Sequence, residues 1–265
     1  MKRYFAALMI TLLCSVAAWG QAANSTVPST QSLNALNANN VCRIFFTKPK
    51  PGADSQLEQA RQKHMQFHKS QGDTWTWHTY VIETGDSQGT MVTSTCGHSW
   101  KDFDAWEQKM GKVDRADAMA SMGPFEASST NRFYVYRADM SLREAHAAPP
   151  PMEAVTIYVL HPGAGNDFVE AITKITAALK KEPSWPKTAG WMQLVNGGEG
   201  PTFVVLSGRQ SWADFAPLDK SITDIATEAY GKEAADALFK VIRDSTAHVF
   251  TETAVYRPDL SYLPK

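Results

Sequence analysis

The chain has 265 residues, of which 43% are hydrophobic, and its 26 Lys and Arg nearly balance its 27 Asp and Glu. This length suits one large domain or two smaller ones, and the apolar content excludes a wholly disordered chain. The near-neutral charge argues against a nucleic-acid partner, because there is no excess of cations to replace the counterions of phosphates. The three cysteines are too few for two four-ligand zinc fingers.

Residues 1–22 have the order of a secretory signal peptide. Lys2 and Arg3 precede an apolar run over 5–13, and small residues follow as far as Ala22. The run is short for a membrane span, so we expect cleavage, no membrane association afterwards, and a periplasmic or secreted protein. The polar, low-complexity stretch 23–40 predicts a flexible tether.

Two short motifs occur twice. Ser-Trp-Lys-Asp-Phe at 99–103 returns as Ser-Trp-Ala-Asp-Phe at 211–215, and Tyr-Arg-Ala-Asp-Met-Ser at 136–141 returns as Tyr-Arg-Pro-Asp-Leu-Ser at 256–261. This internal repetition predicts two similar domains. We expect a first domain over 41–142, a stiff Pro-rich linker over 143–153, and a second domain over 154–265.

Each copy has the pattern of a β-α-β-β-α-β unit. Expected strands cover 41–48, 74–83, 89–96 and 131–137 in the first copy, and 155–161, 190–196, 202–207 and 248–257 in the second. Helices are expected over 55–70 and 167–181, with a further helical region from each Ser-Trp motif. In those motifs the Ser and Asp have the spacing of a capping box, and the aromatic residues should pack the helix start against the sheet. The order predicts an α+β, ferredoxin-like fold.

A tandem pair of such units resembles the dimeric α+β-barrel superfamily, with both subunits fused into one chain. The superfamily includes antibiotic-biosynthesis monooxygenases and haem-binding, chlorite dismutase-like proteins. The resemblance covers nearly all of the chain after the signal peptide, and it is one of architecture, since no diagnostic catalytic motif of a single family is present. It implies that the antiparallel sheets of the two halves pair as a fused barrel.

Cys42 and Cys96 are expected to form a disulfide. In this topology the first and third strands are antiparallel neighbours, and the two cysteines lie at the same edge. An exported protein meets an oxidising compartment, which favours the bond, while two buried free thiols are the alternative. Alternation along the strand places Cys42 with Ile44 and Phe46, and we expect this face to point toward the helices.

The opposite strand faces are then expected to line a small-molecule cavity between the two sheets. Their mixture of aromatic and hydrogen-bonding groups suits a ligand better than a dry core. The predicted ligand-binding residues are Arg43, Trp77, Arg132, Tyr134, Tyr158, Trp191, Gln193 and Glu252. Arg43 and Arg132 suit an anionic group, although Arg132 and Glu252 pairing across the barrel is the structural alternative. A register slip of one residue would invert the whole assignment.

Metal and haem sites are weaker candidates. His64 and His68 lie four positions apart on one face of the first helix, but two ligands do not make a site, and their polar neighbours indicate an exposed face, so we expect no metal. His78 or His248 could serve as an axial haem ligand, but we expect no cofactor. No Gly-x-Ser-x-Gly motif or triad order supports a hydrolase.

The preferred function is therefore an exported small-molecule-binding protein with a cavity rich in Trp, Tyr and Arg. The first alternative is a cofactor-free, monooxygenase-like enzyme that acts on a small aromatic compound. The second is a protein-interaction module in which the barrel interior is only a core. The sequence leaves the ligand, any catalysis and the oligomeric state open.

Overall fold

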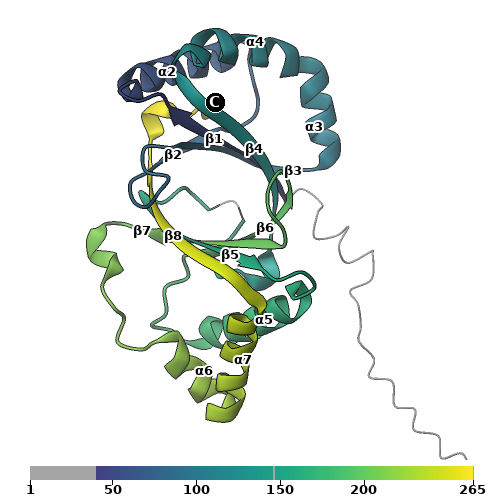
Figure 1. Cartoon of the computed structure of the whole chain (residues 1–265), viewed down its shortest axis with the longest axis vertical. Helices are drawn as coiled ribbons and strands as arrows, with labels where there is room; N and C mark the ends of the chain where they lie inside the picture. The colour runs from purple at the N-terminus through teal and green to yellow at the C-terminus, as the bar shows by residue number, and fades with distance from the viewer. Residues whose placement is uncertain (1–39, 146, 265) are drawn as a thin grey trace, which may run out of the picture.

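The computed structural model describes residues 40–145 and 147–264, so the predicted signal peptide and nearly all of the predicted tether lie outside the described residues. Within those ranges, eight antiparallel strands form a closed barrel in the order β1-β3-β2-β8-β5-β7-β6-β4. Each half of the chain contributes four adjacent strands, and the helices lie on the outside (Figure 1). Among these residues, no helix is both long enough and apolar enough to cross a bilayer.

The first half follows the predicted order. Its strands are β1 (Val41–Pro49), β2 (His78–Ile82), β3 (Met91–His98) and β4 (Glu126–Tyr136). Its helices are α2 (Asp54–Ser70), α3 (Trp100–Trp106) and α4 (Lys112–Ser121), with a π-helical turn at Glu107–Gly111 between the last two.

The second half repeats this arrangement. Its strands are β5 (Met152–Leu160), β6 (Ala189–Asn196), β7 (Thr202–Arg209) and β8 (Thr246–Tyr256), and its helices are α5 (Gly165–Lys181), α6 (Ile222–Tyr230) and α7 (Lys232–Ser245). The β-α-β-β-α-β order is thus confirmed in both halves, although the second helical region of each half is divided. Strand β5 begins at Met152, inside the predicted linker.

The first copy of the repeated Tyr-Arg-x-Asp-x-Ser motif attaches β4 to β6 of the other half. Arg137 forms a bidentate pair with Asp139, at 2.9 and 2.7 Å, which fixes the turn after the strand. The Arg137 N–H donates to the Trp191 carbonyl at 2.8 Å, and the Trp191 N–H donates to the Ser141 hydroxyl at 2.8 Å. The motif therefore holds one of the two junctions between the halves.

The second copy does the same at the other junction. Arg257 pairs with Asp259 at 2.9 and 2.8 Å, its N–H donates to the Thr79 carbonyl at 2.8 Å, and the Thr79 N–H donates to Ser261 at 2.9 Å. Thr79 belongs to β2, which pairs with β8. Each copy of the motif therefore holds one of the two junctions at which strands of the two halves pair.

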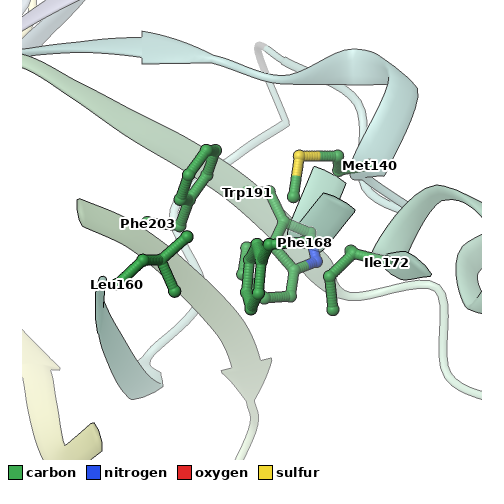
Figure 2. Packing of buried hydrophobic residues seen from close by; sticks show 6 residues of the cluster. All are labelled: Met140, Leu160, Phe168, Ile172, Trp191 and Phe203. Atoms are coloured by element: carbon green, nitrogen blue, oxygen red, sulfur yellow. The ribbon is translucent and has the colours of Figure 1, made fainter. Parts of the chain in front are cut away.

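The hydrophobic core between barrel and helices is clearest under α5. Its apolar residues Phe168, Ile172, Ile175 and Leu179 recur at helical spacing and are buried. Phe168 is fully buried and contacts Trp191 of β6 and Phe203 of β7 (Figure 2). The outer face of the sheet is thus a filled core layer.

The capping-box prediction is confirmed at Ser99, whose side chain accepts from the Asp102 N–H while Asp102 accepts from the Ser99 N–H. The capping box is also present in the second copy, where Asp214 accepts from the Ser211 N–H at 3.3 Å, but it starts a short 3-10 turn and not an α-helix. The predicted packing of the motif aromatics on the sheet is confirmed in the first copy, where the rings of Trp100 and Phe103 lie 5.2 and 5.3 Å from that of Phe133 in β4. In the second copy Phe215 is 40% exposed. Phe103 is buried, but Trp100 and Trp212 are 43% and 58% exposed.

The disulfide prediction is confirmed. Cys42 of β1 and Cys96 of β3, which are 54 positions apart in the sequence, are joined by an S–S bond of 2.05 Å. Strands β1 and β3 are antiparallel neighbours, as expected. The second half has no cysteine, so the bond belongs to the first half alone.

Candidate functional site

The barrel encloses a cavity of about 420 Å³, to which all eight strands contribute residues. Most of its wall is apolar. The aliphatic and large apolar side chains on it are Ile44, Phe46, Ile82, Val92, Val155, Ile157, Met192, Val204 and Leu206. The volume falls in the range of sites that hold small organic molecules.

The predicted face assignment is wrong for β1 and β3. Cys42, Ile44 and Phe46 line the cavity instead of facing the helices, and so do Val92 and Cys96. The reason is that both faces of these strands are largely buried: one packs under helices and the other lines the cavity. Alternation identifies two faces here, but it does not say which one is inside.

Arg43 and Trp77 were predicted to line the cavity, and the structure places both outside the barrel. Arg43 donates to Glu107 of the π-helical turn at 2.9 Å. The Trp77 ring is buried under α2, and its Nε1–H donates to Asp73 at 2.9 Å. A structural role accounts for each of them.

Tyr158, Trp191 and Gln193 also lie outside. Tyr158 and Trp191 stack with ring centroids 5.7 Å apart in the core layer under α5 (Figure 2 shows Trp191 beside Phe168). Gln193 accepts from Arg137 at 2.6 Å, so it supports the β4–β6 junction. On β6 it is Met192, between the two predicted residues, that faces the cavity.

Arg132, Tyr134 and Glu252 do line the cavity, as predicted. The Arg132 guanidinium lies 4.8 Å from the centroid of the Phe46 ring, a cation–π contact. The alternative that Arg132 pairs with Glu252 is wrong, because β4 and β8 are on opposite sides of the eight-strand barrel and the ion pairs among the described residues do not include this one. Their role in ligand binding stays a prediction.

The segment that joins the halves forms a strap along the cavity, described at residues 143–145 and 147–150. Arg143, Pro149 and Pro150 contribute to the wall. The Tyr136 hydroxyl donates to the Arg143 carbonyl, and the Tyr80 hydroxyl donates to the Pro150 carbonyl at 3.3 Å. The predicted linker is therefore part of the site.

Beside the strap, the Arg143 guanidinium donates to Glu153 Oε1 at 2.7 Å, and both side chains are largely buried. Burial raises the pKa of Glu153, and the positive charge of Arg143 opposes that rise. Burial also raises the pKa of the Tyr80 phenol well above its usual value. We call Tyr80, Tyr136, Arg143 and Glu153 the strap cluster. It gives the apolar cavity one polar region.

Two buried polar atoms in the cavity wall have no hydrogen-bond partner among the described residues. They are Arg132 Nε, which is a donor, and Glu153 Oε2, which is an acceptor while the carboxylate is ionised. Each buried polar atom without a partner costs roughly 1–3 kcal/mol. A ligand that offers one acceptor and one donor would relieve both costs.

Among the residues that line the cavity, His78 is the best candidate for a catalytic group. Its Nδ1 lies 3.2 Å from the Tyr256 hydroxyl, and burial lowers its pKa, so the imidazole is neutral at pH 7. Sequence reasoning gave His78 only a haem role and missed the strap cluster. The signal available was the ionisable pair Arg143 and Glu153 at the two ends of the Pro-rich linker.

Of the two histidines considered as axial haem ligands, only His78 lines the cavity. His248 is exposed at the outer end of β8, which excludes it as an axial ligand inside the barrel. His78 faces the cavity, but the wall also presents Glu153 and Glu252, and Arg143 is already engaged by Glu153. Haem propionates pair with cations that remain available, and in the described part of the wall Arg132 is the cation that no ion pair engages. The wall therefore offers a haem one histidine and one such cation.

The prediction that His64 and His68 lie on an exposed face of the helix is wrong. Both imidazoles are buried, with 3% and 1% exposure, and they face Asp114 of α4 on the outside of the barrel. The exposed residues Lys63 and Lys69 lie on the other side of α2. Helical periodicity placed the two histidines together, but the packing of α4 against α2 decided their burial.

A scan of models of known protein families and a search of curated protein sequences both gave no match to this chain. Solved structures do match. An anthrone oxidase-like protein is 15% identical, with 84% of this chain and 93% of that chain covered and a TM-score of 0.53.

A protein from Lactobacillus acidophilus assigned as a monooxygenase is 9% identical, with 85% and 97% of the two chains covered and a TM-score of 0.51. The chain has the fold of the dimeric α+β barrels, here as two fused halves. The resemblance found in the repeats is confirmed at the level of the fold.

Proposed function

We propose that the barrel binds a small, mainly apolar aromatic molecule that carries a hydrogen-bond donor and an acceptor. The observation that carries this proposal is the cavity of about 420 Å³, with an apolar wall and two unpaired polar atoms, Arg132 Nε and Glu153 Oε2. The apolar wall supplies affinity by excluding water, and the few polar groups fix the orientation of the ligand. The interaction-module alternative required a filled barrel, so the cavity counts against it.

Anthrone is a suitable probe, because it is a flat, mostly apolar aromatic ketone and one structural neighbour is an anthrone oxidase-like protein. We expect one anthrone to bind per chain under anaerobic conditions, as measured by titration calorimetry. Met192→Trp fills the cavity and should weaken binding at least about tenfold. Trp191→Phe changes the neighbouring residue on the outer face and should leave the affinity unchanged.

Near-ultraviolet circular dichroism checks that both variants are folded. A folded Met192→Trp protein that binds anthrone like the parent would contradict the proposal. A second pair of results would also contradict it. In that pair the parent protein does not bind anthrone, and native mass spectrometry of the protein purified from its own cells finds no retained small molecule.

A second candidate function is oxidation of such a ligand by O2 without a cofactor. The neutral imidazole of His78 in the cavity wall favours it, since a neutral imidazole can accept a proton from a C–H that is acidified by conjugation with a carbonyl, as the CH2 group of anthrone is. The resulting carbanion would reduce O2. With anthrone, one O2 is consumed and one anthraquinone and one water form, so atoms and electrons balance.

We expect His78→Gln to lower the rate of anthrone-dependent O2 uptake by about 10²-fold or more, measured with an oxygen electrode. His161→Gln, at an exposed histidine, is the matched control and should leave the rate unchanged. Equal rates in the His78→Gln variant and the parent would refute a base role for His78. No uptake above the spontaneous rate would leave binding as the function.

The same proposal places the protein in an oxidising compartment, outside the cytoplasm. The Cys42–Cys96 disulfide supports this location, because such bonds are rare where thiols are kept reduced. Residues 1–22 supply the export signal expected from the sequence. Fractionation of the native cells, with N-terminal sequencing of the mature chain, tests both points.

A further inference from the structure

Two histidines of α2 and one aspartate of α4 converge on the outside of the barrel. His64 Nε2 and His68 Nε2 are 3.2 Å apart, and Asp114 Oδ1 lies 3.4 and 3.3 Å from them. Both imidazoles are buried, and the Asp114 side chain is 15% exposed. Helices α2 and α4 pack against each other there (Figure 1). None of these residues belongs to the cavity wall.

The hydrogen bonds of the two Nδ1 atoms determine which tautomer each histidine adopts. His68 Nδ1 lies 2.8 Å from Asp73 Oδ2, an oxygen that also accepts from Trp77 Nε1–H at 2.9 Å. His64 Nδ1 lies 2.7 Å from Asp117 Oδ2. A carboxylate accepts, so each Nδ1 carries the hydrogen and donates. Both Nε2 atoms therefore present lone pairs to each other.

Three electron-pair donors thus face one point. Among the described residues, Asp114 Oδ1 is buried without a hydrogen-bond partner, although it is close to both Nε2 atoms. A single proton can bridge only one pair of these three atoms. A cation at their centre satisfies all three at once.

The spacing matches tetrahedral coordination. Atoms about 2.0–2.1 Å from a tetrahedral metal ion lie about 3.3 Å from one another, and the three separations here are 3.2, 3.3 and 3.4 Å. Imidazole nitrogens with a carboxylate oxygen form a donor set that suits Zn²⁺. The Asp73 and Asp117 carboxylates hold the far side of each ring, as the outer partners of metal-bound histidines do.

The local charge also suits a divalent cation. Asp73, Asp114 and Asp117 lie against the two imidazoles, and Glu126 is within electrostatic reach of His64, whereas the buried Arg61 guanidinium is one turn before His64. Carboxyl groups therefore outnumber this cation around the three donors, which favours a bound divalent ion.

We propose that His64, His68 and Asp114 form a binding site for one Zn²⁺ ion, with the fourth coordination position left for water. The ligands come from α2 and α4, so the ion fastens the two helices to each other. None of the three ligands lines the barrel cavity, so this site is separate from it.

The test starts with the whole protein stripped of metal by a chelator and dialysed. When Zn²⁺ is added back, we expect elemental analysis to find one bound Zn²⁺ per chain. We also expect the Tm to rise by at least about 3 °C relative to the stripped protein. Co²⁺ in its place should give the intense visible absorption of tetrahedral coordination. Absence of stoichiometric Zn²⁺ binding overturns the proposal.

Asp114→Asn keeps the size of the side chain and should weaken Zn²⁺ binding about 10²-fold, while His68→Gln should abolish it. The matched controls are Asp104→Asn and His161→Gln, at exposed positions, and they should bind Zn²⁺ like the parent. Asp117→Asn should weaken binding by about 10-fold to 100-fold. If His68→Gln does not fold, Asp114→Asn still decides: unchanged Zn²⁺ affinity in that variant overturns the site. Met192→Trp should bind Zn²⁺ normally, which separates this test from that of the cavity.

Discussion

Replacing both Cys42 and Cys96 with alanine is expected to lower the free energy of unfolding by about 4 kcal/mol. The bond joins positions separated by 54 in the sequence, so it closes a long loop in the unfolded chain. Without it, the unfolded state gains the conformational entropy of that loop, while β1 and β3 still pair in the folded state. Urea denaturation of the double variant and the parent measures the difference.

Reduction of the parent protein is the internal control for this result. The reduced parent should lose about as much stability as the double variant, because both lack the same cross-link. The double variant itself should be insensitive to reductant. A loss below about 1 kcal/mol in either protein would show that the loop is already restricted in the unfolded chain.

The two halves and their topology were predictable because the repeats mark equivalent positions. The Tyr-Arg-x-Asp-x-Ser motif ends the last strand of each half, and the structure gives the physical reason: Arg137 and Arg257 each bond to the opposite half. The disulfide followed from the same topology. These features depend on local patterns and on strand order, both of which are visible in one sequence.

The inner and outer faces of the strands were not predictable, because a barrel with an external helix layer has two buried faces. On β1, Ile44 faces the cavity while Arg43 is outside, where Glu107 compensates its charge. A charged residue on a strand normally indicates solvent or a site, so the sequence pointed to the wrong face. Glu107 lies 64 positions away in the sequence, and only the fold brings it near.

The histidine cluster shows the same limit. The spacing of His64 and His68 was visible, but the third donor, Asp114, and the outer partners, Asp73 and Asp117, come from other segments. With only two donors in view, an exposed helix face was the simpler interpretation. The number of converging donors is a property of helix packing, so the sequence alone left it open.

Arg143→Met should lower the free energy of unfolding by about 3 kcal/mol at pH 8 and by less at pH 5. Arg143 is the ion-pair partner of Glu153, whose side chain is only 6% exposed. The variant keeps the length and packing of the side chain but leaves a buried negative charge without its cation. The Arg143 carbonyl still accepts from Tyr136, so the strap keeps that contact.

The pH dependence follows from the pKa of Glu153, which burial raises above its ordinary value of 4.5. Arg143 opposes this rise most strongly and Arg209 opposes it less, so loss of Arg143 lets the pKa of Glu153 in the folded variant climb further. A carboxyl group with a raised folded-state pKa binds its proton more tightly when folded, and stability then falls as the pH rises from the unfolded value through the folded value. The destabilisation is therefore largest above the folded pKa and fades toward pH 4.5.

Adding Glu153→Gln to Arg143→Met should restore most of the lost stability and remove its pH dependence, because no buried charge remains. Urea denaturation at pH 5 and pH 8 of the parent, the single variant and the double variant completes the comparison. Equal losses for the single variant at both pH values would mean that Glu153 is not the group responsible. In that case Arg143 would act through the packing of the strap, and the polar region of the cavity would have to be assigned to Tyr80 and Tyr136 instead.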